Sequence, residues 1–177
     1  WNNSNIVENF DVDQYFHSST NLKCFPRWCL ASMVQTKYFF VIDDDISFDD
    51  NRVISYCIDY FEKSNIEDLI IGHTGVILNK VKTYFDSEHF SNVVKSVNVD
   101  IVKGRFMFMK QSLMNNVTMD VSFTCEDIKI SSHSEHKVLP AFLHNRFVDL
   151  DEGNEALFRT EKQKELRQLA VNQFFCK

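Results

Sequence analysis

Apolar residues occur along the chain in two patterns, as short unbroken runs and at helical spacing, which together predict alternating strands and helices. The run at residues 38–42 (YFFVI) is β-branched or aromatic throughout, which is typical of a strand buried on both faces. Further runs at 69–72 and 75–78 predict two more buried strands. Residues 25–34 and 53–61 repeat apolar side chains at the helical period, so we expect a helix before the first strand and another after it.

The second half of the chain continues this alternation on both sides of Gly104. Residues 97–110 alternate around that glycine and predict two strands with a bend between them. Short helices are expected at 111–116 and 126–131, and a late strand at 138–143. This order of elements is typical of an α/β fold.

The C-terminal segment is expected to be one long helix, from about residue 154 to residue 175. Its most charged stretch, residues 159–168 (RTEKQKELRQ), predicts a face in contact with solvent. The 177 residues are enough for one domain with a substantial core, and they contain no repeat or internal linker. We therefore interpret residues 1–177 as a single α/β domain.

Composition and charge narrow the classes of function. Hydrophobic residues make up 44% of the chain and charged residues 25%, with 17 Phe but only 4 Gly and 2 Pro, a balance typical of globular proteins. The formal net charge of −6 argues against a nucleic-acid partner, because phosphates require a basic surface. No apolar run approaches the roughly 18 to 20 residues that cross a bilayer, and no signal peptide is recognised. We expect a soluble protein with no membrane segment in this chain.

The cysteines are odd in number and contain no C-x-x-C pair. This spacing indicates neither a zinc site nor a disulfide framework. Buried thiols in a reducing compartment, the cytoplasm, are the simpler interpretation. The five residues are Cys24, Cys29, Cys57, Cys125 and Cys176.

The main chemical signal is the acidic run Asp43-Asp44-Asp45, which directly follows the apolar run at 38–42. Ligands of open α/β sheets bind beyond the carboxyl ends of the strands, so these aspartates would lie where a ligand binds. Adjacent carboxylates repel one another unless positive charge is near, and their oxygen atoms suit Mg²⁺ or Mn²⁺ bridging to phosphates. Asp43 and Asp45 form a D-x-D pair, and Asp44 points elsewhere because side chains alternate near a strand end. A solvated loop or helix cap is the alternative for such runs, and we expect it for residues 49–50.

Glu126 and Asp127 form a second acidic element at the start of the helix expected at 126–131. Carboxylates at a helix N-terminus are stabilised by the helix dipole. Capping alone would explain both residues, so the pattern leaves a structural and a catalytic role equally open.

Four segments carry short motifs in a fixed order, namely W-N-N at residues 1–3, N-L-K-C-F-P-R at 21–27 followed by V-I-D-D-D at 41–45, K-G-R-F at 103–106 and C-E-D-I at 125–128. In this order they resemble segments of the exostosin-type glycosyltransferases. The resemblance covers residues 1–130 and implies a GT-A-like fold, a Rossmann-like mixed sheet flanked by helices. It also implies that residue 1 lies beyond the first strand and helix of that fold, so we expect this chain to lack both.

The resemblance implies an enzyme that moves a sugar from a nucleoside-diphosphate sugar, in this family a UDP-sugar, to a glycan or glycoprotein acceptor. It also implies retention of anomeric configuration and dependence on Mn²⁺ or Mg²⁺, which would offset the charge on the leaving diphosphate. The chain's size and Phe content are similar to those of virus-encoded glycosyltransferase domains that decorate capsid proteins, and such a domain would act inside a host cell.

The motifs imply roles for individual residues in binding the donor. By resemblance, Asn2 and Asn3 lie near the nucleotide base, and Arg27 lies near the base or the diphosphate. Asp43 faces the ribose or the metal, and Asp44 belongs to the same donor-binding run.

The same resemblance assigns the metal and the reacting centre. Asp45 is the main metal ligand, with Asp43 beside it. A histidine late in the chain completes the metal shell of many GT-A enzymes, and His144 is the best candidate, with an exposed surface histidine as the alternative interpretation. Glu126 or Asp127 would lie under the transferred sugar, where a carboxylate stabilises an oxocarbenium-like transition state or orients the acceptor hydroxyl.

Two other classes of function fit the acidic run. A haloacid-dehalogenase-like phosphatase also places D-x-D, here Asp43 and Asp45, after an apolar strand. In such an enzyme Asp43 would be the nucleophile toward phosphate, with Mg²⁺ assisting. A non-catalytic module would instead hold a nucleotide sugar in the same acidic pocket without transfer. Fold alone does not decide among these classes.

Overall fold

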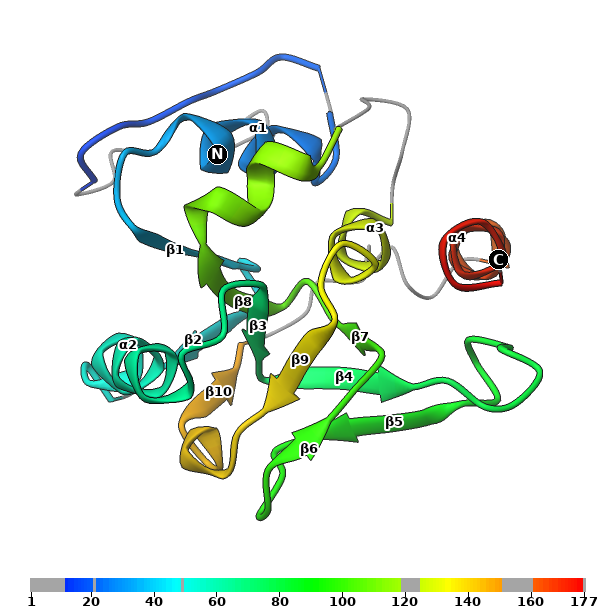
Figure 1. Ribbon diagram of the computed structural model, residues 1–177. Helices are drawn as coiled ribbons and strands as arrows, with labels where there is room; N and C mark the ends of the chain where they lie inside the picture. Colours follow the sequence, from blue (N-terminus) through cyan, green and yellow to red (C-terminus); the bar gives the residue numbers. More distant parts are fainter. Residues whose placement is uncertain (1–11, 21, 49, 119–124, 151–160, 177) are drawn as a thin grey trace.

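The computed structural model describes residues 12–20, 22–48, 50–118, 125–150 and 161–176. Asn2, Asn3 and the first part of the expected C-terminal helix lie outside these residues. The described chain is a mixed α/β fold in which helices flank a mixed β-sheet (Figure 1). No helix in this part of the chain is both long enough and apolar enough to cross a membrane.

A five-stranded sheet forms the centre of the fold, in the order β1-β8-β3-β9-β6. β3 and β9 are parallel, and the other neighbouring strands run antiparallel. β1 therefore lies at an edge of the sheet, next to β8. The strands are β1 (Tyr38–Ile42), β8 (Phe106–Lys110), β3 (Leu69–Gly72), β9 (His136–Leu139) and β6 (Val97–Asn98).

Helices cover both faces of this sheet, and the alternation of side chains along β8 separates the two layers. On one face, α1, η1 and α3 pack against Met107 and Met109. On the other face, α2 packs against Phe106 and Phe108. All four β8 side chains are almost fully buried. The helices are α1 (Phe25–Met33), α2 (Val53–Ser64), α3 (Glu126–Ser131) and α4 (Glu161–Phe175), with short 3₁₀ helices η1 (Gln111–Asn116) and η2 (Ala141–Leu143).

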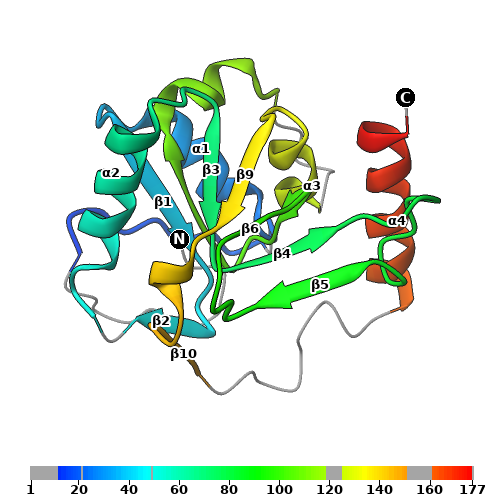
Figure 2. The same ribbon diagram turned by 60° about the horizontal axis from the view of Figure 1, so that its bottom comes forward.

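Two smaller sheets extend the fold. The β4–β5 hairpin of the three-stranded sheet reaches toward α4, which lies at the edge of the molecule (Figure 2). Tyr84, from the loop of this hairpin, packs with Ile128 of α3 and Val171 of α4. This contact fixes α4 beside the acidic N-terminus of α3. The strands are β5 (Glu88–Ser91), β4 (Thr74–Ile77) and β7 (Ile101–Val102) in one sheet, and β10 (Phe147–Asp149) and β2 (Ile46–Phe48) in the other.

Several predicted elements are confirmed with small changes of boundary. The helices expected at 25–34, 53–61 and 126–131 are α1, α2 and α3. The run at 69–72 is β3, which is buried along its whole length. The short helix expected at 111–116 is the 3₁₀ helix η1.

The prediction that the run at 38–42 is buried on both faces is wrong. β1 is an edge strand, and its Phe40 side chain is 38% exposed. The run at 75–78 does form a strand, β4, but this strand belongs to the three-stranded sheet.

The strand boundaries in the second half of the chain also differ from the prediction. Residues 97–110 contain three strands, β6, β7 and β8, where two were expected. β6 and β7 are separated at Asp100, whose carboxylate accepts the Leu78 N–H at 2.7 Å. The late strand ends at Leu139, since Pro140 has no N–H to continue the ladder.

The thiol prediction is confirmed in part. None of the described cysteines forms a disulfide. Cys57 and Cys125 are buried, Cys24 and Cys29 are half-buried, and Cys176 is exposed.

Phe108 tests the aromatic layer of the core. Its ring centroid lies 5.6 Å from that of Tyr38 and 5.7 Å from that of Phe61. Phe108→Ala should lower the free energy of unfolding by about 3–5 kcal/mol, because it removes a buried ring and leaves a cavity. Urea unfolding measures the loss, with Phe40→Ala at the exposed edge position as the matched control. The control should lose clearly less, about 1–2 kcal/mol, and equal losses would contradict the deeper burial of Phe108.

Candidate functional site

The end of β1 meets the start of β8, and this contact brings two of the sequence motifs together. Ile42 pairs with Phe106 in the antiparallel register, and the Asp43 N–H donates to the Arg105 carbonyl at 2.9 Å. The acidic run therefore lies beside the turn that contains Gly104.

The three aspartates of the run do not point the same way. Asp43 and Asp45 are half-buried, whereas Asp44 is exposed. This confirms the alternation predicted for the end of a strand. Asp43 and Asp45 are therefore the members of the run that face the protein.

Arg27 of α1 joins the acidic run to the Gly104 turn. Its guanidinium forms an ion pair with the Asp43 carboxylate, and both side chains are largely buried. A Cβ atom at position 104 would lie 2.8 Å from Nη2 of Arg27, so the absence of a side chain at Gly104 makes room for the guanidinium. Pro26 in the first turn of α1 favours a helix start at this place, directly before Arg27.

Asp127, the second residue of α3, connects three elements. Its Oδ2 atom accepts the Gly104 N–H at 3.2 Å and a guanidinium N–H of Arg167 at 2.6 Å, and its Oδ1 atom accepts the Ile128 N–H at 2.9 Å. Burial by itself would raise the pKa of Asp127, but the charge and hydrogen bond of Arg167 outweigh it and hold the pKa below its ordinary value. Asp127 is therefore an ionised carboxylate with partners on both oxygen atoms.

Arg167 lies in the charged stretch at 159–168 that was expected to face solvent. That prediction is wrong at this residue, whose side chain is 15% exposed. The guanidinium lies 4.6 Å from the centroid of the Tyr84 ring and bonds to Asp127. The physical reason is that a buried carboxylate requires a buried counter-charge.

Glu126, the first residue of α3, differs from its neighbour. It is 3% exposed, and its Oε1 atom has no hydrogen-bond partner within the described part of the chain. Burial raises the pKa of the Glu126 carboxyl to about 7, against the opposing charges of Arg27 and Arg167. Glu126 can therefore gain or lose a proton near neutral pH, as an acid–base group must.

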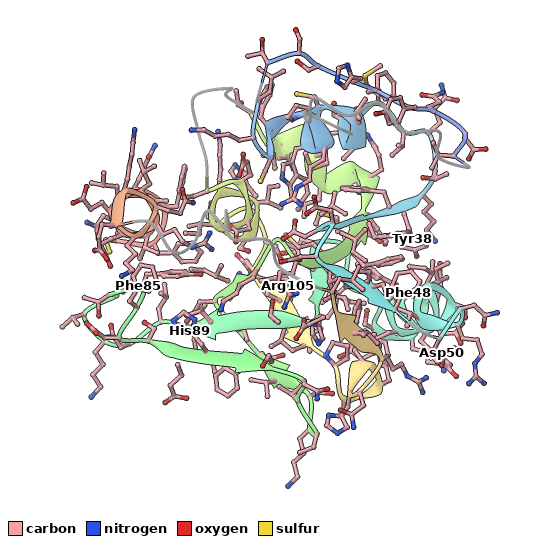
Figure 3. The ribbon with its side chains drawn as sticks, turned by 180° about the vertical axis from the view of Figure 1, so that it is seen from behind. Tyr38, Phe48, Asp50, Phe85, His89 and Arg105 are labelled. Carbon is pink, nitrogen blue, oxygen red and sulfur yellow. The ribbon has the colours of Figure 1, made fainter. Side chains whose placement is uncertain are left out.

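Arg105 balances the second aspartate of the D-x-D pair. Its Nη2 atom lies 3.4 Å from Oδ1 of Asp45, and its Nη1 atom lies 2.8 Å from Oδ1 of Asp149. Asp149 is brought there because β10 pairs with β2, which directly follows the acidic run. In the view of Figure 3, Arg105 lies centrally, between Phe48 and His89.

Arg27, Arg105 and Glu126 each carry a buried polar atom that has no hydrogen-bond partner in the described chain. Nearly all such atoms are paired in native proteins, so these three fit a polar ligand that would pair with them. The nitrogen atoms of Arg27, Trp28 and Arg105 can only donate, so that ligand would carry acceptor oxygens, as phosphates and sugars do. Among the described residues, the unpaired atoms are Arg27 Nε, Trp28 Nε1, His73 Nδ1, Thr74 Oγ1, Arg105 Nε and Glu126 Oε1.

The predicted metal ligands are not assembled into one metal-binding group. In the ranges that the structure describes, no three His, Cys, Asp or Glu side chains are arranged to hold a metal ion. Nδ1 of His144 lies 2.9 Å from the Asn92 carbonyl oxygen, and His144 precedes β10, whereas Asp149 ends it. Mg²⁺-like ions are held by one or two carboxylates together with substrate phosphates. Asp43 and Asp45 fit an ion that arrives with phosphate better than an ion held by the protein alone.

The sequence predicted Arg27, Asp43, Glu126 and Asp127 as site residues, and the structure places these four together. The sequence did not predict other residues of the site. Arg105 and Lys103 flank the glycine of K-G-R-F, and that position was the signal available for them. His73 packs against Phe147 in a tilted arrangement with ring centroids 4.3 Å apart. Burial, with help from the charge of Arg105, lowers the pKa of His73 to about 4, so it is neutral. No local signal distinguishes Arg167 from the other basic residues of α4.

A comparison of the chain with models of known protein families found no match, and a comparison with curated proteins found no similar protein. We therefore infer function from the geometry of the site and from the four motifs.

Arg167→Met tests the ion pair that anchors α4. The variant leaves Asp127 buried without its counter-charge, so the free energy of unfolding should fall by about 3–5 kcal/mol. Urea unfolding measures the change. The double variant Asp127→Asn/Arg167→Met removes both charges and should recover part of the loss. A loss below about 1 kcal/mol in the single variant would show that the ion pair is not structural.

Glu126→Gln should stabilise the protein above neutral pH but not in acid. The pKa of Glu126 is about 7 in the folded protein against an ordinary 4.5, so the folded state binds the proton more tightly and stability falls as pH rises between these values. At about pH 8 the variant should be more stable than wild type by up to roughly 3 kcal/mol, and at about pH 4 the difference should vanish. Urea unfolding of both proteins at both pH values measures this. A difference independent of pH would contradict the raised pKa.

Proposed function

We propose that this chain is the donor-binding and catalytic domain of a metal-dependent glycosyltransferase that uses a nucleoside-diphosphate sugar, with a UDP-sugar expected from the motifs. The main support is spatial. Arg27, Asp43, Gly104 and Asp127 come from motifs up to about a hundred residues apart, yet they are linked by direct contacts. Three of the four segments of the resemblance, at residues 21–45, 103–106 and 125–128, thus contact one another, and the fourth lies outside the described residues.

The two acidic residues of C-E-D-I take different roles in this proposal. Asp127 has partners on both carboxylate oxygens, so it positions the Gly104 turn and α3. Glu126 carries an Oε1 atom with no hydrogen-bond partner among the described residues, and its pKa is about 7. We therefore assign to Glu126 the contact with the transferred sugar or the acceptor hydroxyl, where it stabilises positive charge or holds a proton.

Cationic side chains near the Gly104 turn suit the diphosphate of the donor. Arg27 lies close to Gly104, and Lys103 directly precedes it in the chain and is half-buried, with a pKa lowered by burial and by Arg167. Asp43 and Asp45 would hold Mn²⁺ or Mg²⁺, which offsets the charge on the leaving diphosphate when it is bound. Transfer with retention and a glycan or glycoprotein acceptor complete the proposal, both from the resemblance alone.

Calorimetry of UDP binding tests the donor assignment. Wild-type protein should bind UDP with Mn²⁺ present and clearly less without it. Asp45→Asn should weaken the metal-dependent binding by about tenfold or more, because it removes one carboxylate from the metal site. Asp59→Asn, which removes an exposed carboxylate from α2, is the matched control and should bind as wild type does. If no nucleoside diphosphate binds wild-type protein with metal present, the donor assignment is wrong.

Turnover then separates the enzyme from its alternatives. Hydrolysis or transfer of a UDP-sugar should slow by roughly 10²- to 10⁴-fold in Glu126→Gln, while UDP binding is retained. UDP binding without any turnover would indicate a non-catalytic module. Hydrolysis of an aryl phosphate that depends on Asp43 would indicate the phosphatase.

A further inference from the structure

Arg27 occupies the position at Asp43 that a metal ion would need. Its guanidinium forms an ion pair with Oδ1 of Asp43, and the two side chains are only 20% and 29% exposed. Burial raises the pKa of Asp43, and the charge of Arg27 opposes this most strongly. Asp43 thus already has a cation, and that cation belongs to the protein.

Arg27 also has one N–H donor without an acceptor among the described residues. Its Nε atom is buried and has no hydrogen-bond partner in the described chain. Gly104 lies so close to Nη2 that a Cβ atom there would be at 2.8 Å. The guanidinium is thus held between the acidic run and the turn, with one N–H unused. An anion with several oxygens, such as a diphosphate, can bond this N–H once the guanidinium turns toward it.

Charge decides which ions can enter. A divalent cation arriving alone at Asp43 must displace Arg27 and would leave two cations facing each other in a partly buried place. A cation that arrives with a diphosphate brings an anion for Arg27, so the guanidinium can turn from Asp43 to phosphate while the carboxylate turns to the metal. Each charge then keeps a partner throughout.

We propose that Arg27 is a placeholder for the metal at Asp43, so that a divalent cation binds this site together with a diphosphate and is excluded when it comes alone. This inference rests on the proposed function, because it takes Asp43 as a metal ligand and the donor as a diphosphate. It assigns to Arg27 a role in the order of binding beyond contact with the donor.

Arg105 likewise pairs with Asp45, the second aspartate of the D-x-D pair, but at a longer distance than its other ion pair. Its contact with Asp45 is 3.4 Å, whereas its contact with Asp149 is 2.8 Å. Arg105 therefore has another carboxylate to hold when Asp45 turns to a metal. Arg27 has no such second partner among its ion pairs in the described chain, which makes it the residue to change.

Binding of Mn²⁺ in the absence of nucleotide tests the placeholder role. Calorimetry and the loss of the free-ion electron paramagnetic resonance signal should show no saturable binding to wild-type protein. Arg27→Met should bind Mn²⁺ at least about tenfold more tightly than wild type, because the competing cation is gone. Arg27→Lys keeps the charge and should behave as wild type does. Arg27→Met/Asp43→Asn should lose the binding again.

The matched control is Arg52→Met, which breaks an arginine–aspartate ion pair with Asp50 outside the site and should leave Mn²⁺ binding unchanged. Circular dichroism checks that each variant folds, and Arg27→Gln replaces Arg27→Met if the latter does not. Equal Mn²⁺ affinity of wild type and the Arg27 variant overturns the inference. UDP tested with Mn²⁺ on wild-type protein is read separately, and its failure there would overturn the donor assignment while the comparison without nucleotide still decides the role of Arg27.

Discussion

The arrangement of the site depends on one buried ion pair, between Asp127 and Arg167. Asp127 begins α3, Arg167 lies in α4, and the same carboxylate also holds the Gly104 turn between β7 and β8. A buried carboxylate is stable only when partners of this kind surround it. The contacts therefore fix three elements that are far apart in the sequence, and they make α4 part of the site.

Around this ion pair, each half-buried aspartate of the acidic run faces an arginine. Asp43 faces Arg27, and Asp45 faces Arg105. The charges of the site largely cancel, although the whole chain carries a net charge of −6. A balanced site has little attraction for a free cation or a free anion, but it can accept the two together because each finds a counter-charge. In the proposed order of binding, selectivity comes from the ion pairs of the protein itself and needs no additional gate.

Local signals in the sequence were sufficient for the main helices and strands, for both members of the Arg27–Asp43 ion pair, and for the carboxylate alone in the Asp45–Arg105 and Asp127–Arg167 pairs. The helical spacing over residues 25–34 predicted α1, and the apolar run before Asp43 predicted β1. The edge position of β1 was not predictable, because it depends on pairing with a strand more than sixty residues away. The same limit applied to Arg167, whose neighbours in α4 are equally charged. Only the packing of α4 against α3 selects this one to meet Asp127.

The two faces of β8 give the domain a mechanical asymmetry. Met107 and Met109 lie beneath α1 and α3, which carry the site, whereas Phe106 and Phe108 lie beneath α2. Unbranched thioether side chains rearrange at little cost, while tilted and stacked rings keep close to one geometry. Small rotations of α1 or α3 can thus be absorbed without opening a void, on a base that the aromatic layer keeps rigid. A single strand with the alternating sequence F-M-F-M thereby sets which side of the protein is compliant and which side is stiff.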